Sequence, residues 1–272
     1  MAMSSDKPII WAAAAVVVAG SVALYLYSHR GPPKTTPLAS APEVQSAPAE
    51  PATPAAPVIE HPVPGASSPG EPAVPSLEQS DRPLREALSA LPGAPGLEKL
   101  LVPENLIRHI VVTVDNLSGR KVAVEQRPLK ATPGEFKTLS TGDQLTISPE
   151  NYARYQPFIK VVTAVDAQQV VKVYYHFYPL FQSAFDELGY QGAYFNDHVV
   201  ALIDHLLATP EVTGPIALVQ PNVMYRYADP ALEALSPGQK TLLRMGPANE
   251  ALLKARLREL KVQLLAQQRG HP

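Results

Sequence analysis

The polar residues whose spacing comes closest to a reactive cluster form two groups within one predicted helix. Asn196-Asp197-His198 stands near the start of this helix, and Asp204-His205 follows two turns later. Residues seven apart share a helix face, which would pair Asp197 with Asp204 and His198 with His205. Carboxylates and imidazoles are the groups that perform general acid–base catalysis and that bind zinc.

The spacing alone does not complete a metal or catalytic site. Seven residues span about 10 Å of helix axis, too far for two ligands of one ion unless other elements contribute. The sequence has no His-x-x-x-His or His-Glu-x-x-His pair. Asp197 also suits a helix start, where a carboxylate matches the helix dipole. No catalytic, cofactor-binding or metal-binding residue is therefore assigned. The weak candidates for an undefined site are Tyr194, Asn196, Asp197, His198, Asp204 and His205.

Other reactive patterns are missing from the sequence. The chain has no cysteine, which excludes disulfides, thiolate metal sites and a Cys nucleophile. It has no Gly-x-Ser-x-Gly elbow, Gly-rich phosphate loop or dinucleotide fingerprint. The net charge is −2, so nucleic acid is not expected as a partner. No cofactor is predicted.

Half of the aromatic residues fall between Tyr174 and Phe195. Asp166 is predicted to cap a long central helix over residues 166–188 that bends near Pro179. The aromatic rings either form the core or line a pocket for glycan or peptide. His176 is predicted to be a buried or half-buried histidine of this helix. Arg108 and His109 are predicted to be solvated beside the apolar face of an earlier helix.

The elements that position these residues begin with an apolar run at residues 9–27, which contains no charge. At about 1.5 Å per residue, a helix of this length can just cross a membrane of roughly 30 Å. We predict a tail at residues 1–8 and a single uncleaved transmembrane helix at 9–28. Lys7 and the N-terminal amine on one side nearly balance Arg30 and Lys34 on the other, so the charges do not decide the orientation. The short tail before the run and the Pro-rich segment after it favour a cytoplasmic N-terminus and an external domain.

Residues 29–77 are predicted to be a disordered Pro/Ala-rich linker, because few large apolar residues are available to bury. Pro48, Pro51, Pro54 and Pro57 recur every third residue and would line one face of a polyproline helix. Such a segment is either a stiff spacer or a docking site for a proline-recognising partner.

Residues 78–268 are predicted to form a mainly α globular domain with one or two small β-hairpins. The strand pairs are placed at 136–139 with 145–147 and at 216–219 with 223–227. Helices are expected from Ser80 or Asp81, at 97–101 and 104–116, from 148–150, at 166–188 and 194–208, as two short pieces near 230–245, and at 248–267.

The last helix carries a leucine stripe with basic residues on its flanks. The stripe is predicted to pack on the domain, with pairing to another chain as the alternative. Its members are Leu252, Leu253, Leu257, Leu260, Leu264 and Leu265, and the flanking residues are Lys254, Arg256, Arg258 and Lys261.

Several stretches resemble a family of bacterial envelope proteins known only as a domain of unknown function (DUF family 3014). Two of the most distinctive are Ser-Pro-Glu-Asn-Tyr-Ala-Arg-Tyr at 148–155 and Gln-Lys-Thr-Leu-Leu-Arg-Met-Gly-Pro at 239–247. The resemblance covers residues 77–265. The other stretches are 101–108, 112–117, 178–182, 187–190, 194–197 and 203–210. The resemblance implies a bacterial source, a membrane-anchored architecture and no established activity.

Together these observations predict a single-pass protein of the bacterial inner membrane with a periplasmic binding or scaffold domain. Its expected partners are the lipid bilayer through residues 9–27 and an envelope protein or cell-wall polymer. One alternative is a hydrolase-like envelope enzyme using the Asp and His groups at 197–205. The other is a periplasm-spanning adaptor similar in layout to TonB, although the uncharged anchor lacks the polar residue that energy transduction needs.

Overall fold

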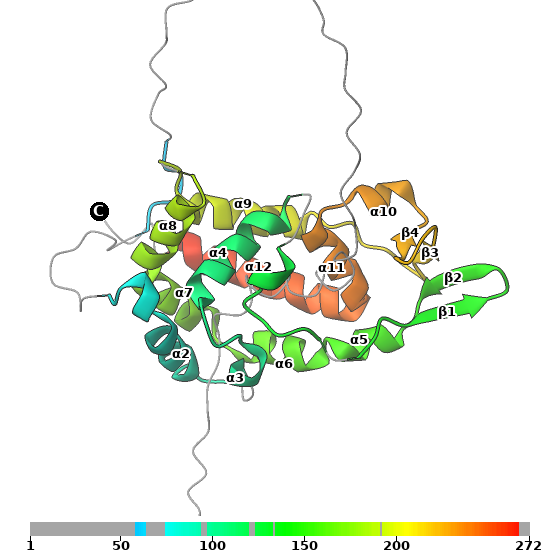
Figure 1. Ribbon diagram of the computed structural model, residues 1–272, viewed down its shortest axis with the longest axis horizontal. Helices are drawn as coiled ribbons and strands as arrows, with labels where there is room; N and C mark the ends of the chain where they lie inside the picture. Colours follow the sequence, from blue (N-terminus) through cyan, green and yellow to red (C-terminus); the bar gives the residue numbers. More distant parts are fainter. Residues whose placement is uncertain are drawn as a thin grey trace, which may run out of the picture.

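A computed structural model gives the structure of this chain and describes residues 58–63, 74–93, 97–119, 123–132, 134–190 and 192–266. They form a mostly helical globular domain with a small antiparallel sheet at one end (Figure 1). The predicted mainly α domain is confirmed. The predicted anchor, its tail and most of the predicted linker lie outside the described residues. No helix within the described ranges is long and apolar enough to cross a membrane.

The helices follow the predicted order, but their ends shift and the helix predicted at 166–188 is divided in two. They are η3 (Leu77–Gln79), α2 (Asp81–Ser89), α3 (Leu97–Leu100), α4 (Leu106–Leu117), η4 (Val124–Gln126), α5 (Glu150–Arg154), α6 (Gln156–Ala164), α7 (Ala167–His176), α8 (Tyr178–Glu187), α9 (Phe195–Leu207), α10 (Pro230–Ala234), α11 (Pro237–Met245) and α12 (Pro247–Ala266).

The predicted central helix is two helices, α7 and α8, separated at Phe177. Asp166 caps α7 as predicted, because its carboxylate accepts a hydrogen bond from the Gln169 N–H at 3.0 Å. Pro179 has no N–H with which to continue the α7 ladder, and it instead occupies the first turn of α8, where helices tolerate proline. The proline therefore starts a new helix rather than bending the old one.

Most of the aromatic residues between Tyr174 and Phe195 are buried in the core where α7, α8 and α9 meet or pack against it, whereas Tyr190 is 41% exposed. Phe185 and Phe195 are fully buried with ring centroids 5.3 Å apart, and Phe181 stacks on Phe195 at 6.0 Å. An apolar cavity of about 50 Å³ remains beside Tyr174 and Phe181, between α4, α7, α9 and α12.

The longest helix, α12, lies against α6, α7, α9 and α11 (Figure 1). Leu253, Leu257, Leu260 and Leu264 are buried, so the predicted packing on the domain is confirmed. Leu252, in contrast, is 47% exposed. Lys254 and Arg256, which lie on the flanks of the stripe as predicted, are also buried, with 3% and 6% of their surface exposed. Neighbours on several sides of α12 cover its basic flank as well as its leucines.

The two predicted hairpins are joined into one four-stranded antiparallel sheet in the order β1-β2-β3-β4. Gly142 has φ +59 in the turn between β1 and β2, a conformation that favours glycine. One face of the sheet covers a second small core that includes Ile147, Leu218 and Tyr227. The strands are β1 (Thr138–Thr141), β2 (Gln144–Ile147), β3 (Ala217–Val219) and β4 (Arg226–Tyr227).

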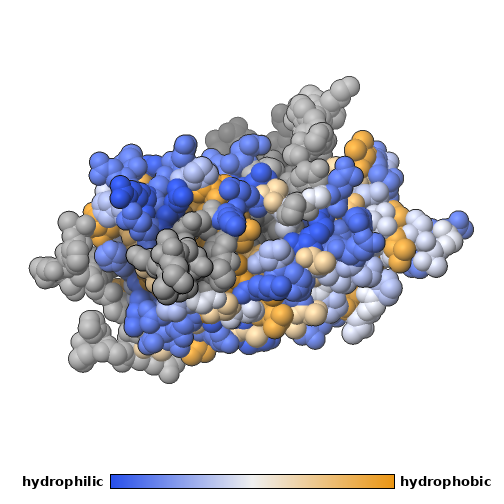
Figure 2. All heavy atoms as spheres, turned by 90° about the horizontal axis from the view of Figure 1, so that it is seen from below, coloured by the Kyte–Doolittle hydropathy of each residue, from blue (hydrophilic) through white to orange (hydrophobic). Residues whose placement is uncertain are grey.

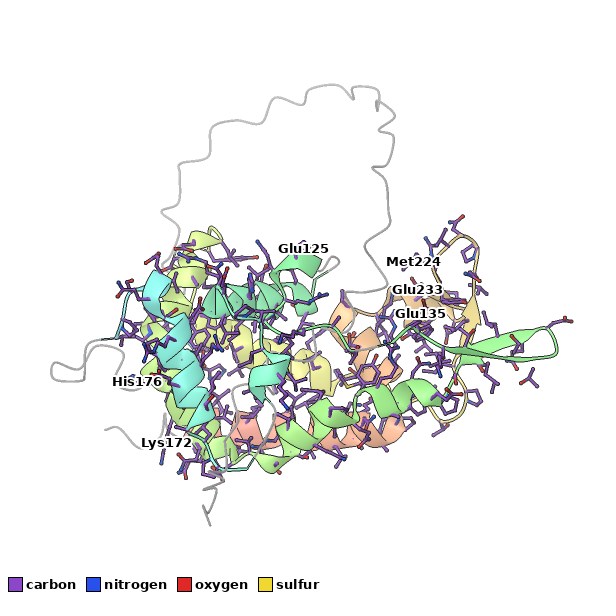
Figure 3. The ribbon with its side chains drawn as sticks, turned by 60° about the horizontal axis from the view of Figure 1, so that its bottom comes forward. Glu125, Glu135, Lys172, His176, Met224 and Glu233 are labelled. Atoms are coloured by element: carbon purple, nitrogen blue, oxygen red, sulfur yellow. The ribbon has the colours of Figure 1, made fainter. Side chains whose placement is uncertain are left out.

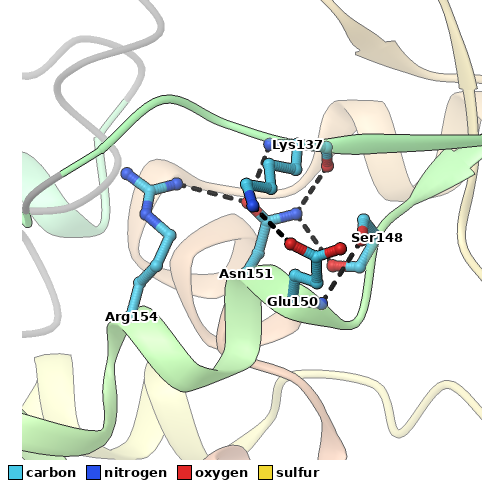
Figure 4. A network of polar contacts seen from close by, with 5 residues as sticks. All are labelled: Lys137, Ser148, Glu150, Asn151 and Arg154. Atoms are coloured by element: carbon cyan, nitrogen blue, oxygen red, sulfur yellow. Dashed lines mark hydrogen bonds and ion pairs between the residues drawn. The ribbon is translucent and has the colours of Figure 1, made fainter.

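A buried asparagine fastens the sheet to α5 (Figure 4). The Asn151 side chain donates to the carbonyls of Lys137 at 2.6 Å and Ser148 at 2.8 Å, and it accepts from the Lys137 N–H at 2.9 Å. Glu150 forms an ion pair with Lys137 across the same junction. Ser148 accepts from the Glu150 N–H at 3.3 Å, in keeping with the predicted helix start.

The surface differs from two predictions about charged residues. His176 is exposed rather than half-buried, and Figure 3 shows it with Lys172 on the outside of the helical part. Arg108 is not simply solvated, because it binds Glu187 through two hydrogen bonds of 2.8 and 3.0 Å and contacts Glu78 at 3.1 Å. Where Figure 2 shows coloured atoms, hydrophilic residues dominate and hydrophobic ones lie in separate small groups.

Candidate functional site

The start of α9 binds a segment of the chain that lies far earlier in the sequence. Residues 58–63 belong to the predicted disordered linker, yet they have a defined position on the domain. The segment is neither helix nor strand and bends at Glu60 and His61. Val63, at its end, is 6% exposed and joins the main hydrophobic core. Residues 74–77 also belong to the predicted linker, and Val74 and Leu77 pack against the same core.

Asp197 binds two consecutive backbone groups of this segment. Its carboxylate oxygens accept hydrogen bonds from the Glu60 N–H at 3.1 Å and the His61 N–H at 2.7 Å. Asp197 lies in the first turn of α9, as predicted, where the helix dipole stabilises a negative charge. The carboxylate, however, accepts its hydrogen bonds from the N–H groups of residues 60 and 61 and not from those of α9.

Asn196 is completely buried and connects the segment to the aromatic core. Its Nδ2 donates to the His61 carbonyl at 2.8 Å, and its Oδ1 accepts from the Tyr174 hydroxyl at 3.2 Å. Its backbone N–H donates to the Tyr178 hydroxyl at 3.2 Å. Both Oδ1 and Nδ2 of the side chain thus form a hydrogen bond, as a buried amide requires.

Tyr194 completes the contact. Its hydroxyl accepts a hydrogen bond from the Val63 N–H at 2.8 Å. Tyr194, Asn196 and Asp197 together form the docking site, which we define as these three residues with the bound residues 58–63. Three of the six weak candidates are therefore brought together, and their shared partner is backbone rather than a metal or a second acidic residue.

Gln182 and Tyr178 hold the docking site in place. Gln182 Oε1 accepts from the Tyr178 hydroxyl and from the Phe195 N–H, both at 2.9 Å, and its Nε2 donates to the Ala193 carbonyl at 2.9 Å. Burial, reinforced by the neighbouring Tyr194 hydroxyl, raises the pKa of Tyr178 above its ordinary value. Tyr178 therefore stays protonated at neutral pH and remains a donor to Gln182.

His198 lies beside Asp115 of α4, and not beside His205, with which the spacing would pair it. Its Nε2 is 3.7 Å from an Asp115 oxygen on α4, and its ring centroid lies 5.4 Å from that of Phe185. Burial lowers the pKa of His198, while the Asp115 charge opposes this shift. Nε2 is buried without a hydrogen bond in the part of the chain that the structure describes.

Asp204 and His205 contact the last two helices. Asp204 binds Lys261 of α12 at 2.5 and 2.6 Å. His205 Nε2 lies 2.8 Å from the Ser236 hydroxyl, which also caps α11 in a reciprocal pair with Gln239. The pairs suggested by the seven-residue spacing, Asp197 with Asp204 and His198 with His205, are not formed, because each side chain has a separate partner.

The described residues contain no group of three or more His, Cys, Asp and Glu side chains that could hold a metal ion. The chemistry that the docking site can perform is recognition of polypeptide, through one carboxylate, one amide and one phenol. Sequence reasoning missed the bound half of the site. The sequence signal that could identify residues 58–63 is weak. It is an apolar Val63 beside Pro62, and prolines and small apolar residues recur throughout the linker.

The comparisons with known proteins identify a family but no characterised relative. No curated protein and no solved structure matches the chain. Residues 106–261 match the family model described as "Protein of unknown function (DUF3014)", which confirms the resemblance found in the sequence. The match begins at α4 and includes the docking-site residues of α9, whereas residues 58–63 lie outside it. The chain belongs to the DUF3014 family.

Proposed function

We propose that this protein is a membrane-anchored binding or scaffold domain of the bacterial envelope and that it recognises polypeptide. One observation carries the proposal: the start of α9 holds residues 58–63 by their backbone groups. Backbone contacts require a particular chain conformation and few particular side chains, which is how many peptide-recognition domains achieve affinity.

The contacts are of a strength that suits binding. Hydrogen bonds to a charged group, such as those to the Asp197 carboxylate, contribute about 1.5–3 kcal/mol each, and neutral ones about 0.5–1.5 kcal/mol. Burial of a valine side chain contributes about 1.5–3 kcal/mol. Ordering the segment costs about 1–2 kcal/mol per residue and offsets much of this gain. The expected result is a contact that forms readily and can be exchanged.

The separate partners of the four Asp and His side chains favour binding over an acid–base site built from them. Asp197 is engaged with backbone N–H groups and Asp204 with Lys261. His198 faces Asp115, and His205 contacts Ser236. A general acid and a general base must converge on one substrate atom, and these four groups point to four different elements.

The membrane anchor and periplasmic location complete the proposal and rest on the sequence. The uncharged run at 9–27 supplies the anchor, and the Pro-rich residues that follow supply the tether. A reporter enzyme that is active only outside the cytoplasm, fused after Pro272, should be active in cells. A well-expressed but inactive fusion would place the domain on the other side of the membrane.

Capture experiments with the full-length chain test the binding function. The purified protein, immobilised in detergent, is incubated with envelope proteins and separately with cell-wall polymers. We expect specific retention of envelope protein. Retention of wall polymer alone would replace polypeptide with glycan as the ligand, and no retention of either would contradict the proposal.

A further inference from the structure

The docking site contacts the bound segment at a defined series of backbone positions. Acceptors face the N–H groups of residues 60, 61 and 63, and a donor faces the carbonyl of residue 61. No acceptor in the described structure serves position 62, which is occupied by proline and has no N–H. The site thus matches a peptide with two consecutive N–H groups, then proline, then one more N–H.

Val63 is the one fully buried side chain of residues 58–63. Val63 is buried, whereas Pro62 is exposed, Ile59 is 49% exposed and Val58 is 85% exposed. A small apolar residue after the proline therefore provides the anchor, and the exposed positions 58–60 are free to vary, whereas His61 is half-buried. The proline also restricts His61 to extended backbone conformations, which lowers the entropy lost on binding.

A segment of another protein with this pattern would make the same contacts. The site residues lie within the family match, while the bound segment lies outside it. The covalently attached segment has the advantage of a high effective concentration, in the millimolar range for flexible attachments. It would therefore mask the site against weaker peptides in solution.

We infer that residues 58–63 are an intramolecular ligand of a peptide-binding site, and that this site takes a partner protein's Pro-containing segment with a small apolar residue after the proline. The inference rests on the proposed function, since it names the ligand of the same domain. Binding of the partner displaces residues 58–63. Displacement also changes the tether, because residues 29–57 span at most about 100 Å and residues 58–73 add up to about 55 Å.

The test uses two matched substitutions in the full-length chain, Val63→Asp and Val58→Asp. Both place a carboxylate in the same segment, but only the first replaces a buried anchor. The probe is a fluorescent peptide with the sequence of residues 55–66, and its affinity is measured by anisotropy. We expect weak binding to the unmodified chain and to Val58→Asp. Val63→Asp should bind the peptide about tenfold more tightly if nine-tenths of the sites are masked in the unmodified chain.

A double variant identifies the site that the peptide uses. Adding Asp197→Asn to Val63→Asp should remove the gain in affinity, whereas adding Asp204→Asn should leave it. A probe with aspartate in place of its valine should not bind. Circular dichroism confirms that each variant is folded, and the milder Val63→Ala provides a smaller gain in affinity should Val63→Asp fail to fold.

Three outcomes would overturn the inference. Equal peptide affinity for the Val63→Asp and Val58→Asp chains would show that residues 58–63 do not mask a site. A gain that survives Asp197→Asn would place the site elsewhere. A concentration-dependent dimer of the unmodified chain, lost in Val63→Asp, would assign the site to a second copy. If envelope proteins are nevertheless captured by a chain carrying Asp197→Asn, the binding function stands and this choice of site fails.

Discussion

The two ends of α9 use the same kinds of side chain for different tasks. At the first end, Asn196 and Asp197 bind backbone groups that lie 135–137 residues earlier in the sequence. At the other end, Asp204 and His205 contact α12 and the cap of α11. These later elements lie within the region matched by the family, as α9 does, whereas the segment bound at the first end does not.

The two ends of α9 differ in how much buried surface becomes exposed when their contacts break. Contacts at the second end join helices that share the buried core, so breaking them exposes packed surface. Contacts at the first end hold one short segment whose only buried residue is Val63. A unit with few buried contacts can open locally at a small free-energy cost while the rest of the domain stays folded. The first end is therefore suited to exchange and the second to stability.

The largest expected effect is at the second end, for Lys254→Met. Lys254 lies 2.7 Å from the Thr209 carbonyl, just after α9, and 2.7 Å from Glu250, and the side chains of the ion pair are 4% and 7% exposed. Removing the lysine leaves a buried carboxylate and a buried carbonyl, which should lower the free energy of unfolding by about 3–5 kcal/mol. Urea denaturation measures the loss.

Lys261→Met is the matched control for this prediction. Lys261 also forms an ion pair near the end of α9, but its side chain is 28% exposed and that of its partner Asp204 is 52% exposed. Its loss should be below about 1 kcal/mol. Equal losses for the two lysines would show that burial does not distinguish the two ion pairs.

Asn196→Ala should have the next largest effect and should separate the two ends. It leaves the Tyr174 hydroxyl and the His61 carbonyl without their partner, which costs about 2 kcal/mol. It should also speed hydrogen exchange at the amides of residues 60, 61 and 63. The comparison variant is Asn249→Ala, since Asn249 is 2% exposed and bonded to the Tyr152 and Met245 carbonyls.

Asn249→Ala should cost a similar free energy of unfolding without changing exchange in residues 60–63. If both variants accelerate exchange in residues 60–63 equally, these residues are released only when the whole domain is destabilised. The contact at the first end of α9 then does not open independently of the rest of the domain.

The helical framework could be predicted from the sequence because its signals are local. Asp166 is a cap that acts within its own helix, and the leucine period of α12 reports one buried face. The hydrogen-bond partners of Asp81, in contrast, are not local. The sequence predicts that α2 starts at Ser80 or Asp81, and the helix does start there, but the Asp81 carboxylate accepts from the Asn105 and Leu106 N–H groups at the start of α4. The choice of partner depends on packing that spacing along the chain does not encode.

The candidate site shows the same division. Tyr194, Asn196 and Asp197 were found because they are polar residues at a helix start. Their ligand was missed because a Pro-rich composition predicts disorder for the whole linker, although one buried valine and four backbone hydrogen bonds are enough to place residues 58–63. The burial of Lys254 was missed because a periodic pattern describes one face of a helix and α12 is covered on several.

A smaller effect is expected for Asp197→Asn, which tests the first end of α9 more selectively. An asparagine oxygen can replace one acceptor, but its NH₂ group would face the other N–H, and the charge is lost. Hydrogen exchange at residues 60 and 61 should accelerate about tenfold, equivalent to ~1.4 kcal/mol. Asp204→Asn, in the same helix, should leave both amides unchanged, and acceleration in that variant would argue against a local contact.

The smallest expected effect is a pH dependence that involves His198, next to the docking site, and His109 of α4. Burial lowers the pKa of both imidazoles, with Asp115 opposing the shift at His198 and Asp81 opposing it at His109. The unfolded chain then binds more protons than the folded chain between the lowered pKa values and about 6.5. The contribution of these two histidines to the free energy of unfolding should be fully present above pH 6.5. It should be lost as the pH falls through this interval.

Urea midpoints at pH 7.5, 6.5 and 5.5 measure this slope, and the two histidines can be separated by substitution. His198→Asn and His109→Asn should each flatten part of the slope, and the double variant should flatten more. If residues 58–63 depend on the first turn of α9, acid should also speed amide exchange in this segment of the unmodified chain, after correction for the intrinsic rate. His198→Asn should weaken that response and His109→Asn should not. Identical responses in the two variants would mean that acid acts on the domain as a whole, and that the two ends of α9 are released together.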